Sequence, residues 1–292
     1  MRSHKALVAV VLGCLLLSAG LMLATNESWD EDGLTVCVTL PWQKEMLERI
    51  GNGKLEAVLF VKPGGDAHGG ELEVRDIISA SRSIAYFYVG SGVEWEVINL
   101  PTLMEALPQV AMVDMSRDLT LLAALDDGHG HGPIDAHVWT SPANLRVMAE
   151  LVYDYLLELD PGNADAYTNG LNDYVGELDE IITLADTLLG PNAGKRFLVW
   201  HPAWRYLSED YGLQEISLES PYSGGMTLED LLDLSKMEEE FSQIFIKPDD
   251  PVMEQSEVFA ARGIEVKIAN PLAMSYLSEL GGFIEALHES WE

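Results

Sequence analysis

Basic residues are scarce in this chain. Its 292 residues include 17 Lys and Arg against 48 Asp and Glu, which gives a formal net charge of −31. Nucleic-acid-binding surfaces place Lys and Arg opposite the phosphates, so this balance argues against that class of partner. The negative charge fits a soluble, self-repelling surface that raises the local concentration of cations, but it does not say which cation.

Cysteine is nearly absent as well. One of the two cysteines, Cys14, lies in an apolar N-terminal segment, so Cys37 stands alone in the remainder of the chain. A single cysteine cannot form an intrachain disulfide, even in a compartment that would permit one. Cys37 lies in the alternating run LTVCVTL, where we expect it to pack as a small hydrophobic residue.

Residues 1–25 differ in composition from the rest. A short basic start precedes an apolar run, Ala6–Ala24, and an acidic, polar stretch follows. This pattern predicts an export signal peptide or an uncleaved membrane anchor, and the length of the run leaves both open. The sequence before Cys14 loosely resembles a lipobox, but Leu15–Leu23 continues the apolar run, so we favour an anchor cysteine over a lipidated one.

Strands and helices alternate through the rest of the chain, which predicts parallel sheets built from βαβ units. We expect an α/β fold with two lobes at 33–160 and 190–292, each with a parallel four-stranded sheet flanked by helices. The predicted strands are Gly33–Leu40, Leu55–Val61, Ile84–Val89, Val110–Asp114, Arg196–Trp200, Glu215–Leu218, Gln243–Lys247 and Ile264–Ile268. The predicted helices include Gln43–Ile50, Glu71–Ala80, a short one near Leu100–Ala106, Ala143–Leu159, Ala203–Asp210, Leu228–Glu239, Pro251–Arg262 and Ser275–His288.

One predicted helix is much longer than the others. It covers 163–189, between the stop signal Asp160-Pro161-Gly162 and the terminator Gly190-Pro191. A helix of this length spans roughly 39 Å, the length of a whole domain. We therefore expect it to join the two lobes.

Three of the seven histidines, His68, His137 and His201, occupy comparable loop positions. His68 follows the second predicted strand and His201 directly follows the strand Arg196–Trp200. Ligands of parallel α/β sheets bind beyond the carboxyl ends of the strands, and imidazole suits zinc and other borderline divalent metals. Any single histidine is more often an ordinary core or surface residue, so spacing alone leaves a metal site and this alternative about equally supported.

Four local motifs favour the metal site. They are PGGDAH at 63–68 with Glu71 and Arg75-Asp76-Ile77; Asp135-Ala136-His137-Val138-Trp139 with Pro142; Phe197–Trp200 with His201-Pro202-Ala203-Trp204, Tyr206 and Tyr211-Gly212-Leu213; and Asn270-Pro271-Leu272. In this order and spacing they resemble the zinc- and manganese-binding receptors of ABC importers, over roughly Leu34 to Leu287. The resemblance implies two α/β lobes clamped about a rigid long helix.

The resemblance also implies the ligands. His68 and His137 match metal ligands from the N-terminal lobe, and His201 matches one from the C-terminal lobe. The manganese branch carries a carboxylate at the third position, so His201 indicates the zinc branch. We therefore expect an exported Zn²⁺ receptor, with Mn²⁺ or another divalent metal less favoured. We also expect a monomer, held at the membrane by its N-terminal segment, that delivers the ion to an ABC permease and its ATPase subunit.

The fourth ligand departs from the family pattern. The usual aspartate slot falls on Ser275, and a serine hydroxyl is a poor zinc ligand. A water could complete the site, a carboxylate such as Glu219 or Asp249 could move in, or affinity could be reduced. Lys247 stands where the family often has an acid, which would lower the negative charge of the site if the side chain points inward.

A second histidine cluster lies in the run DDGHGH at 126–131. Zinc receptors carry a mobile histidine-rich loop at this place, so His129 and His131 could gather metal weakly, and a plain glycine-rich turn is equally compatible. Two other function classes stay open. Three histidines and a water also make a catalytic zinc site, although no HExxH motif and no poised general base are visible. A surface adhesin of the same fold is the third reading.

Overall fold

The computed structural model describes residues 33–63, 70, 72–124, 133–218 and 240–292, and within them Leu34–Glu292 forms one compact unit. The expected signal or anchor at 1–25 lies outside the described residues, as do His68, His129, His131 and Glu219. Within the described ranges, no helix combines the length and the hydropathy that crossing a bilayer requires.

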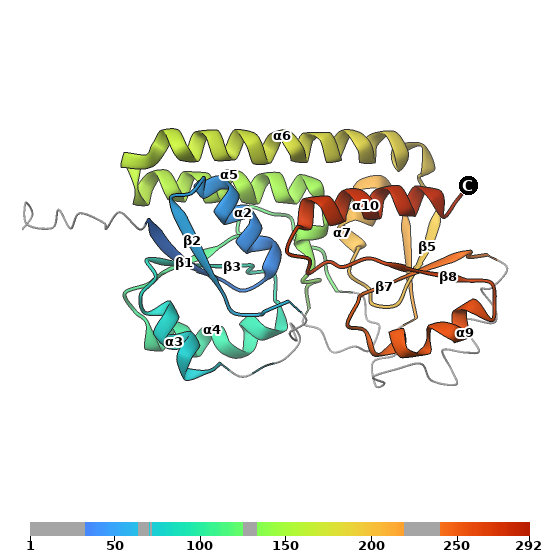
Figure 1. Ribbon diagram of the computed structural model, residues 1–292, viewed down its shortest axis with the longest axis horizontal. Coiled ribbons are helices and arrows are strands. Elements are labelled where there is room, and N and C mark those ends of the chain that lie inside the picture. Colours follow the sequence, from blue (N-terminus) through green and yellow to red (C-terminus); the bar gives the residue numbers. More distant parts are fainter. Residues whose placement is uncertain (1–32, 64–69, 71, 125–132, 219–239) are drawn as a thin grey trace, which may run out of the picture. The chain divides into compact units, whose positions relative to one another are not determined.

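Two parallel four-stranded sheets form the frame (Figure 1). The first has the order β2-β1-β3-β4 and the second the order β6-β5-β7-β8, so both sheets share one topology. The strands are β1 (Leu34–Val38), β2 (Leu55–Leu59), β3 (Ala85–Tyr88), β4 (Ala111–Asp114), β5 (Arg196–Val199), β6 (Gln214–Ser217), β7 (Gln243–Ile246) and β8 (Glu265–Ile268). The predicted fold class is confirmed.

The central strands are apolar because helices cover both of their faces. In β1, Val36, Cys37 and Val38 are fully buried. The Cys37 thiol lies 3.1 Å from the hydroxyl of Ser83, and burial raises its pKa to about 11. Cys37 is thus a packed, un-ionised core residue, as its place in the sequence predicts.

The helices and short 3₁₀ turns lie between and beside the strands. They are α2 (Pro41–Gly51), α3 (Val74–Ala80), α4 (Glu94–Ala106), η1 (Val138–Thr140), α5 (Pro142–Leu159), η2 (Pro161–Asn163), α6 (Ala164–Leu188), η3 (Gly190–Asn192), α7 (Arg205–Tyr211), η4 (Pro251–Gln255), α9 (Ser256–Ala260) and α10 (Tyr276–Glu289). The helix predicted at Leu228–Glu239 lies outside the described residues.

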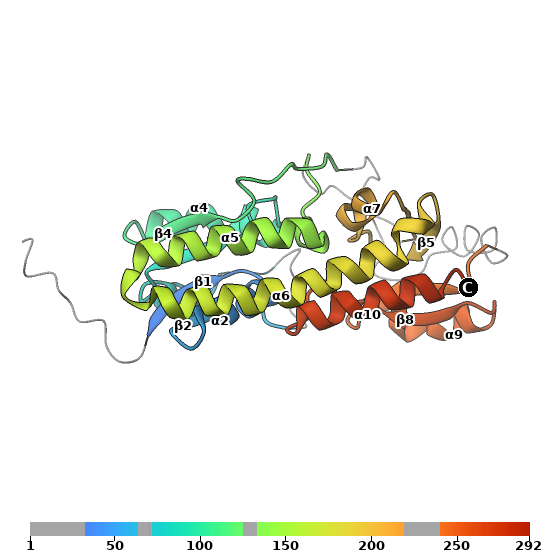
Figure 2. The same cartoon turned by 90° about the horizontal axis from the view of Figure 1, so that it is seen from above.

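The long helix α6 packs against α2 and α5 beside the first sheet and against α10 beside the second (Figure 2). Gly170 lets α2 approach closely, because a Cβ there would lie 2.3 Å from the carbonyl oxygen of Ile50. The Arg49 guanidinium adds an ion pair with Glu177 of α6 at 2.7 Å. The long helix thus has packed neighbours from both halves of the unit.

Helix α4 begins six residues earlier than predicted. Proline is disfavoured inside a helix because it removes one backbone hydrogen bond, so Pro101 suggests a start near Leu100. In the structure the helix begins at Glu94 and continues through Pro101. The carbonyl that loses its partner belongs to Val97, a 64% exposed residue that water can solvate. The first half of α4, which the sequence did not predict, carries the buried side chains Glu96 and Asn99.

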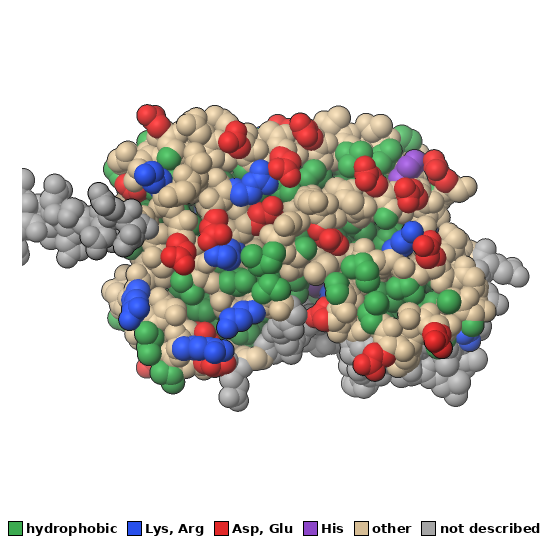
Figure 3. All heavy atoms as spheres, viewed as in Figure 1, with side chains coloured by type: hydrophobic (Ala, Val, Ile, Leu, Met, Phe, Trp, Pro, Cys, Tyr) green, Lys and Arg blue, Asp and Glu red, His purple; other side chains and the backbone are tan. Residues whose placement is uncertain are grey.

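Charge is unevenly spread over the face shown in Figure 3. Asp and Glu side chains are scattered over the whole face, whereas most of the Lys and Arg visible from this side gather over the half that contains the first sheet. The sequence shows the same asymmetry, because residues 33–82 carry six Lys and Arg and seven Asp and Glu. The excess negative charge therefore belongs mainly to the rest of the chain.

Candidate metal site

His137 lies in a tight turn just before η1. Its φ of −83° and ψ of 42°, with a hydrogen bond from Val138 N to Ala136 O at 2.9 Å, make it the central residue of an inverse γ-turn. Its ring nitrogen Nδ1 lies 3.0 Å from Oδ1 of Asp135. A carboxylate on one ring nitrogen fixes the orientation of the imidazole and leaves Nε2 for a metal.

Asp135 is suited to this role. Its side chain is 11% exposed, and it also accepts a hydrogen bond from the backbone N–H of His137 at 2.9 Å. Burial opposes ionisation of the carboxyl group, but the hydrogen bonds and charge of His137 outweigh that effect and lower the pKa of Asp135. The carboxylate is therefore ionised at neutral pH and stabilises the ring it contacts.

His201 comes from the other half of the unit. It lies two residues beyond the end of β5 and is 6% exposed. The segment after it is anchored by Glu215 of β6, whose carboxylate accepts a hydrogen bond from Trp204 N at 2.9 Å. Desolvation of this carboxylate raises the pKa of Glu215 to about 8, against the hydrogen bonds that it accepts. The backbone near His201 is thus held by a partly buried acid on the neighbouring strand.

The two imidazoles meet at their Nε2 atoms. The distance from His137 Nε2 to His201 Nε2 is 3.4 Å, and the ring planes cross at 74°. Two nitrogens bound to one tetrahedral zinc at about 2.0–2.1 Å lie about 3.3–3.4 Å apart. The observed separation therefore matches one edge of a zinc coordination tetrahedron.

The third predicted ligand, His68, lies outside the described residues. Accordingly, the described part of the chain contains no group of three His, Cys, Asp or Glu side chains arranged to hold a metal. Ser275 is exposed at the N-terminus of α10, and Asp249 is also exposed. Lys247 forms an ion pair with the buried Asp250 at 3.3 Å, so a carboxylate compensates its ammonium charge.

The other motif residues hold the His137 loop in place. The indole Nε1 of Trp139 donates to the carbonyl of Pro271 at 2.8 Å, which connects the second sequence motif to the fourth. Tyr206 of α7 donates its hydroxyl to Asp135 O at 3.1 Å, which connects the third motif to the second. The second, third and fourth motifs are therefore in direct contact.

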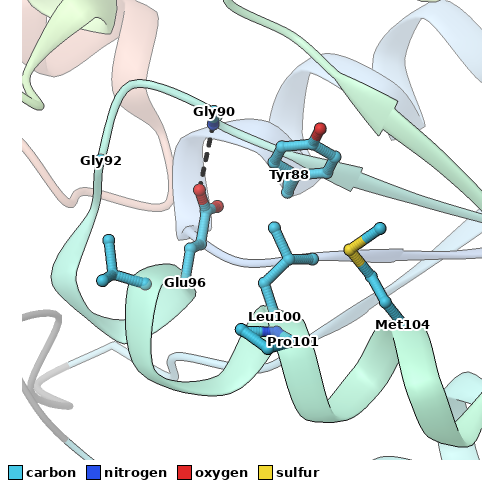
Figure 4. A pocket seen from close by; sticks show the side chains of 8 residues that line it. Tyr88, Gly90, Gly92, Glu96, Leu100, Pro101 and Met104 are labelled. Atoms are coloured by element: carbon cyan, nitrogen blue, oxygen red, sulfur yellow. Dashed lines mark hydrogen bonds between the residues drawn. The ribbon is translucent and has the colours of Figure 1, made fainter.

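A cavity of about 280 Å³ lies between the end of β3 and α4 (Figure 4). Its lining is mainly apolar and includes Tyr88, Leu100 and Met104. Glu96 borders it, and its carboxylate accepts a hydrogen bond from Gly90 N (Figure 4). Among the described residues, no histidine lines this cavity, which sets it apart from the imidazole pair.

Comparison with known proteins decides the family. The model of the family described as zinc-uptake complex component A, periplasmic, matches residues 36–287. The chain belongs to this family. It is therefore an extracytoplasmic solute-binding receptor of an ABC importer, as the sequence motifs predict.

Individual relatives are distant. The iron-binding protein YfeA of Yersinia pestis is 25% identical over 73% of this chain and 68% of its own length. The manganese-binding lipoprotein MntA of Halalkalibacterium halodurans is 25% identical over 66% of this chain and 63% of its own. A crystal structure of ZnuA superposes with a TM-score of 0.77 at 25% identity, covering 89% of this chain and 100% of that one. The names of these relatives indicate more than one metal.

Sequence reasoning missed four polar residues beside the histidine loops. Ser91, Glu96, Glu215 and Ser217 all form hydrogen bonds with backbone next to or near the ligand loops. The Gly90-Ser91-Gly92 turn after a buried strand was a usable signal for the first of these. Nothing in the sequence points to Ser217, because its contact depends on the pairing of β5 with β6.

Proposed function

We propose that this receptor binds Zn²⁺ as its cargo and passes the ion to an ABC permease driven by an ATPase subunit. His68, His137 and His201 are the proposed ligands. The observation that carries the proposal is the 3.4 Å separation between His137 Nε2 and His201 Nε2, because it equals a tetrahedral edge. A nitrogen-rich site favours zinc over manganese, which prefers oxygen ligands.

Membership of a family of transport receptors supports this function over the two rivals, a zinc hydrolase and an adhesin. The proposed receptor acts as a monomer outside the cytoplasm and is held at the membrane by residues 1–25. We propose a water molecule in its fourth coordination position, because Ser275 offers only a hydroxyl and Asp249 is exposed. Glu219, the other candidate, lies outside the described residues.

Calorimetric titration with Zn²⁺ and Mn²⁺ tests the proposal. We expect 1:1 zinc binding to the wild type, and we expect His137→Ala, His201→Ala and His68→Ala each to weaken it by about 100-fold or more. Changes outside the first ligand shell already cost about 10–100-fold, so loss of a ligand costs at least the upper end. Manganese should bind more weakly than zinc throughout.

His288→Ala is the matched control. His288 is a half-buried histidine of α10 that lies 3.4 Å from Glu292, and it has no part in the proposed site. Its substitution should leave zinc binding unchanged. Wild-type affinity in His201→Ala would refute the ligand assignment, and tighter binding of Mn²⁺ than of Zn²⁺ would refute the proposed cargo.

A further inference from the structure

A serine hydroxyl contacts the backbone immediately before each of the two histidines, His137 and His201, whose rings meet. Ser91 Oγ donates to the carbonyl of Ala136, the residue before His137. Ser217 Oγ donates to the carbonyl of Trp200, the residue before His201, at 2.7 Å. Ser91 follows β3 of the first sheet and Ser217 ends β6 of the second, so the same contact occurs once in each half of the unit.

Such a contact controls the position of the following side chain. The peptide bond is planar, so holding the carbonyl oxygen also fixes the N–H and the Cα of the next residue. At His137 the constraint is doubled, because Ala136 O also accepts the Val138 N–H that closes the γ-turn. The direction in which the imidazole leaves the backbone is therefore set by contacts that do not involve the ring.

An acidic side chain lies near each serine, and it is buried at Glu96 and partly buried at Glu215. Glu96 is 3% exposed and accepts hydrogen bonds from Val89 N at 2.7 Å and Gly90 N at 3.0 Å, directly before Ser91. On the other sheet Glu215 lies two residues before Ser217, and it binds the backbone of Trp204. The backbone before Ser91 is thus tied to the Glu96 carboxylate, and the strand that carries Ser217 also carries Glu215.

The turn that brings Ser91 to the carbonyl of Ala136 also depends on a glycine. Gly90 has a φ of +85°, and a Cβ there would lie 1.9 Å from Asp114 Oδ1. Only glycine lets the chain pass this close to β4 in that conformation. The short segment that presents Ser91 to Ala136 is therefore set by backbone requirements at Gly90 as well as by Glu96.

We propose that Ser91 and Ser217 are positioning residues of the metal site, which set the separation of the two imidazoles and thereby the metal affinity without touching the ion. This inference rests on the ligand roles proposed above for His137 and His201. Both serines lie outside every motif that identifies the family in this sequence.

Zinc affinity, the visible absorption of bound Co²⁺ and the melting temperature of the metal-free protein test the proposal. In Ser91→Ala and Ser217→Ala we expect zinc affinity to fall about 3- to 10-fold, the loss that one hydrogen bond produces. We also expect a changed Co²⁺ absorption spectrum, because the ligand geometry is altered. Ser217→Thr keeps the hydroxyl on a half-buried residue and should restore both properties.

Ser83→Ala separates positioning from stability. Ser83 is a buried serine at the opposite end of β3, where its hydroxyl contacts Cys37 Sγ. Its substitution should lower the melting temperature and leave zinc affinity and the Co²⁺ spectrum unchanged. The inference is overturned if Ser91→Ala and Ser217→Ala bind zinc like Ser83→Ala with an unaltered Co²⁺ spectrum. A failure of the ligand assignment itself would instead appear in His137→Ala and His201→Ala.

Discussion

Glu96 makes the stability of this protein depend on pH in a direction that can be tested. Its carboxyl group is almost fully buried, and desolvation raises its pKa from 4.5 to about 7, against hydrogen bonds from Gly90 N, Thr39 Oγ1 and Val89 N. A raised folded-state pKa means that the folded protein holds a proton which the unfolded chain releases. Stability from this group is therefore complete below about pH 4.5 and is lost as pH rises through about 7.

The size of the effect follows from the shift. One pKa unit corresponds to about 1.4 kcal/mol, so the ionised Glu96 costs the fold about 3 kcal/mol relative to the protonated form. Glu96→Gln cannot ionise. Between pH 4.5 and 8 its free energy of unfolding should therefore fall by about 3 kcal/mol less than that of the wild type. Absolute stability can also change, because the amide offers one acceptor oxygen where the carboxylate offers two.

Urea unfolding of the chelator-treated protein at several pH values measures this difference. Glu105→Gln is the matched control, since Glu105 lies on the same helix and is exposed. It should reproduce the wild-type dependence on pH. If Glu96→Gln shows the same dependence as the wild type, Glu96 does not carry the raised pKa, and burial of its carboxyl group has been misjudged.

Two further substitutions test the packing that supports the site. Gly170→Ala should lower the free energy of unfolding by about 1–3 kcal/mol, because its Cβ would press on backbone carbonyls of α2. Gly176→Ala on the same helix meets no atom within 4 Å and should stabilise the protein by about 0.5–1 kcal/mol. Equal effects of the two substitutions in urea unfolding would contradict this packing. Trp139→Phe keeps an aromatic ring beside Trp42 but removes the hydrogen bond to the carbonyl of Pro271. We expect the free energy of unfolding to fall by about 1 kcal/mol in the same assay. Unchanged stability would show that this hydrogen bond contributes nothing.

The central strands were predictable because each is a short apolar run, whereas β6 (QEIS) and β8 (EVKI) are partly polar strands at the edges of the second sheet. Buried parallel strands have this signature, and the order of the chain then implies the crossovers. Helix α4 was predicted only in its second half, because the stretch before Leu100 mixes polar and aromatic residues without a clear apolar face and contains no strong helix start signal. The helix continues through Pro101 where Val97, the residue whose carbonyl loses its partner, is exposed, and sequence alone does not reveal that exposure.

The candidate site was predictable at the histidines but not at their supports. His137 and His201 stand in motifs with fixed spacing, so local sequence identifies them. Ser217 and Glu215 reach the His201 segment across a strand pair, and their role depends on register. Ser275 is a position that sequence spacing points to but that the structure leaves exposed. Spacing places it at the usual acidic slot, but in the structure Glu45 of α2 accepts the N–H groups of Tyr276 and Leu277 that begin α10.

The separation of the two imidazoles is a property of the whole unit rather than of the histidines. The His137 loop is joined to the C-terminal half by Trp139 Nε1 to Pro271 O, Tyr206 OH to Asp135 O, and Tyr276 OH to Trp139 O at 3.3 Å. Moving His137 away from His201 would break these bonds, each worth about 0.5–1.5 kcal/mol. The long helix α6, packed on both halves, opposes the same motion. Binding energy is therefore not spent on bringing the two proposed ligands together, which favours high metal affinity.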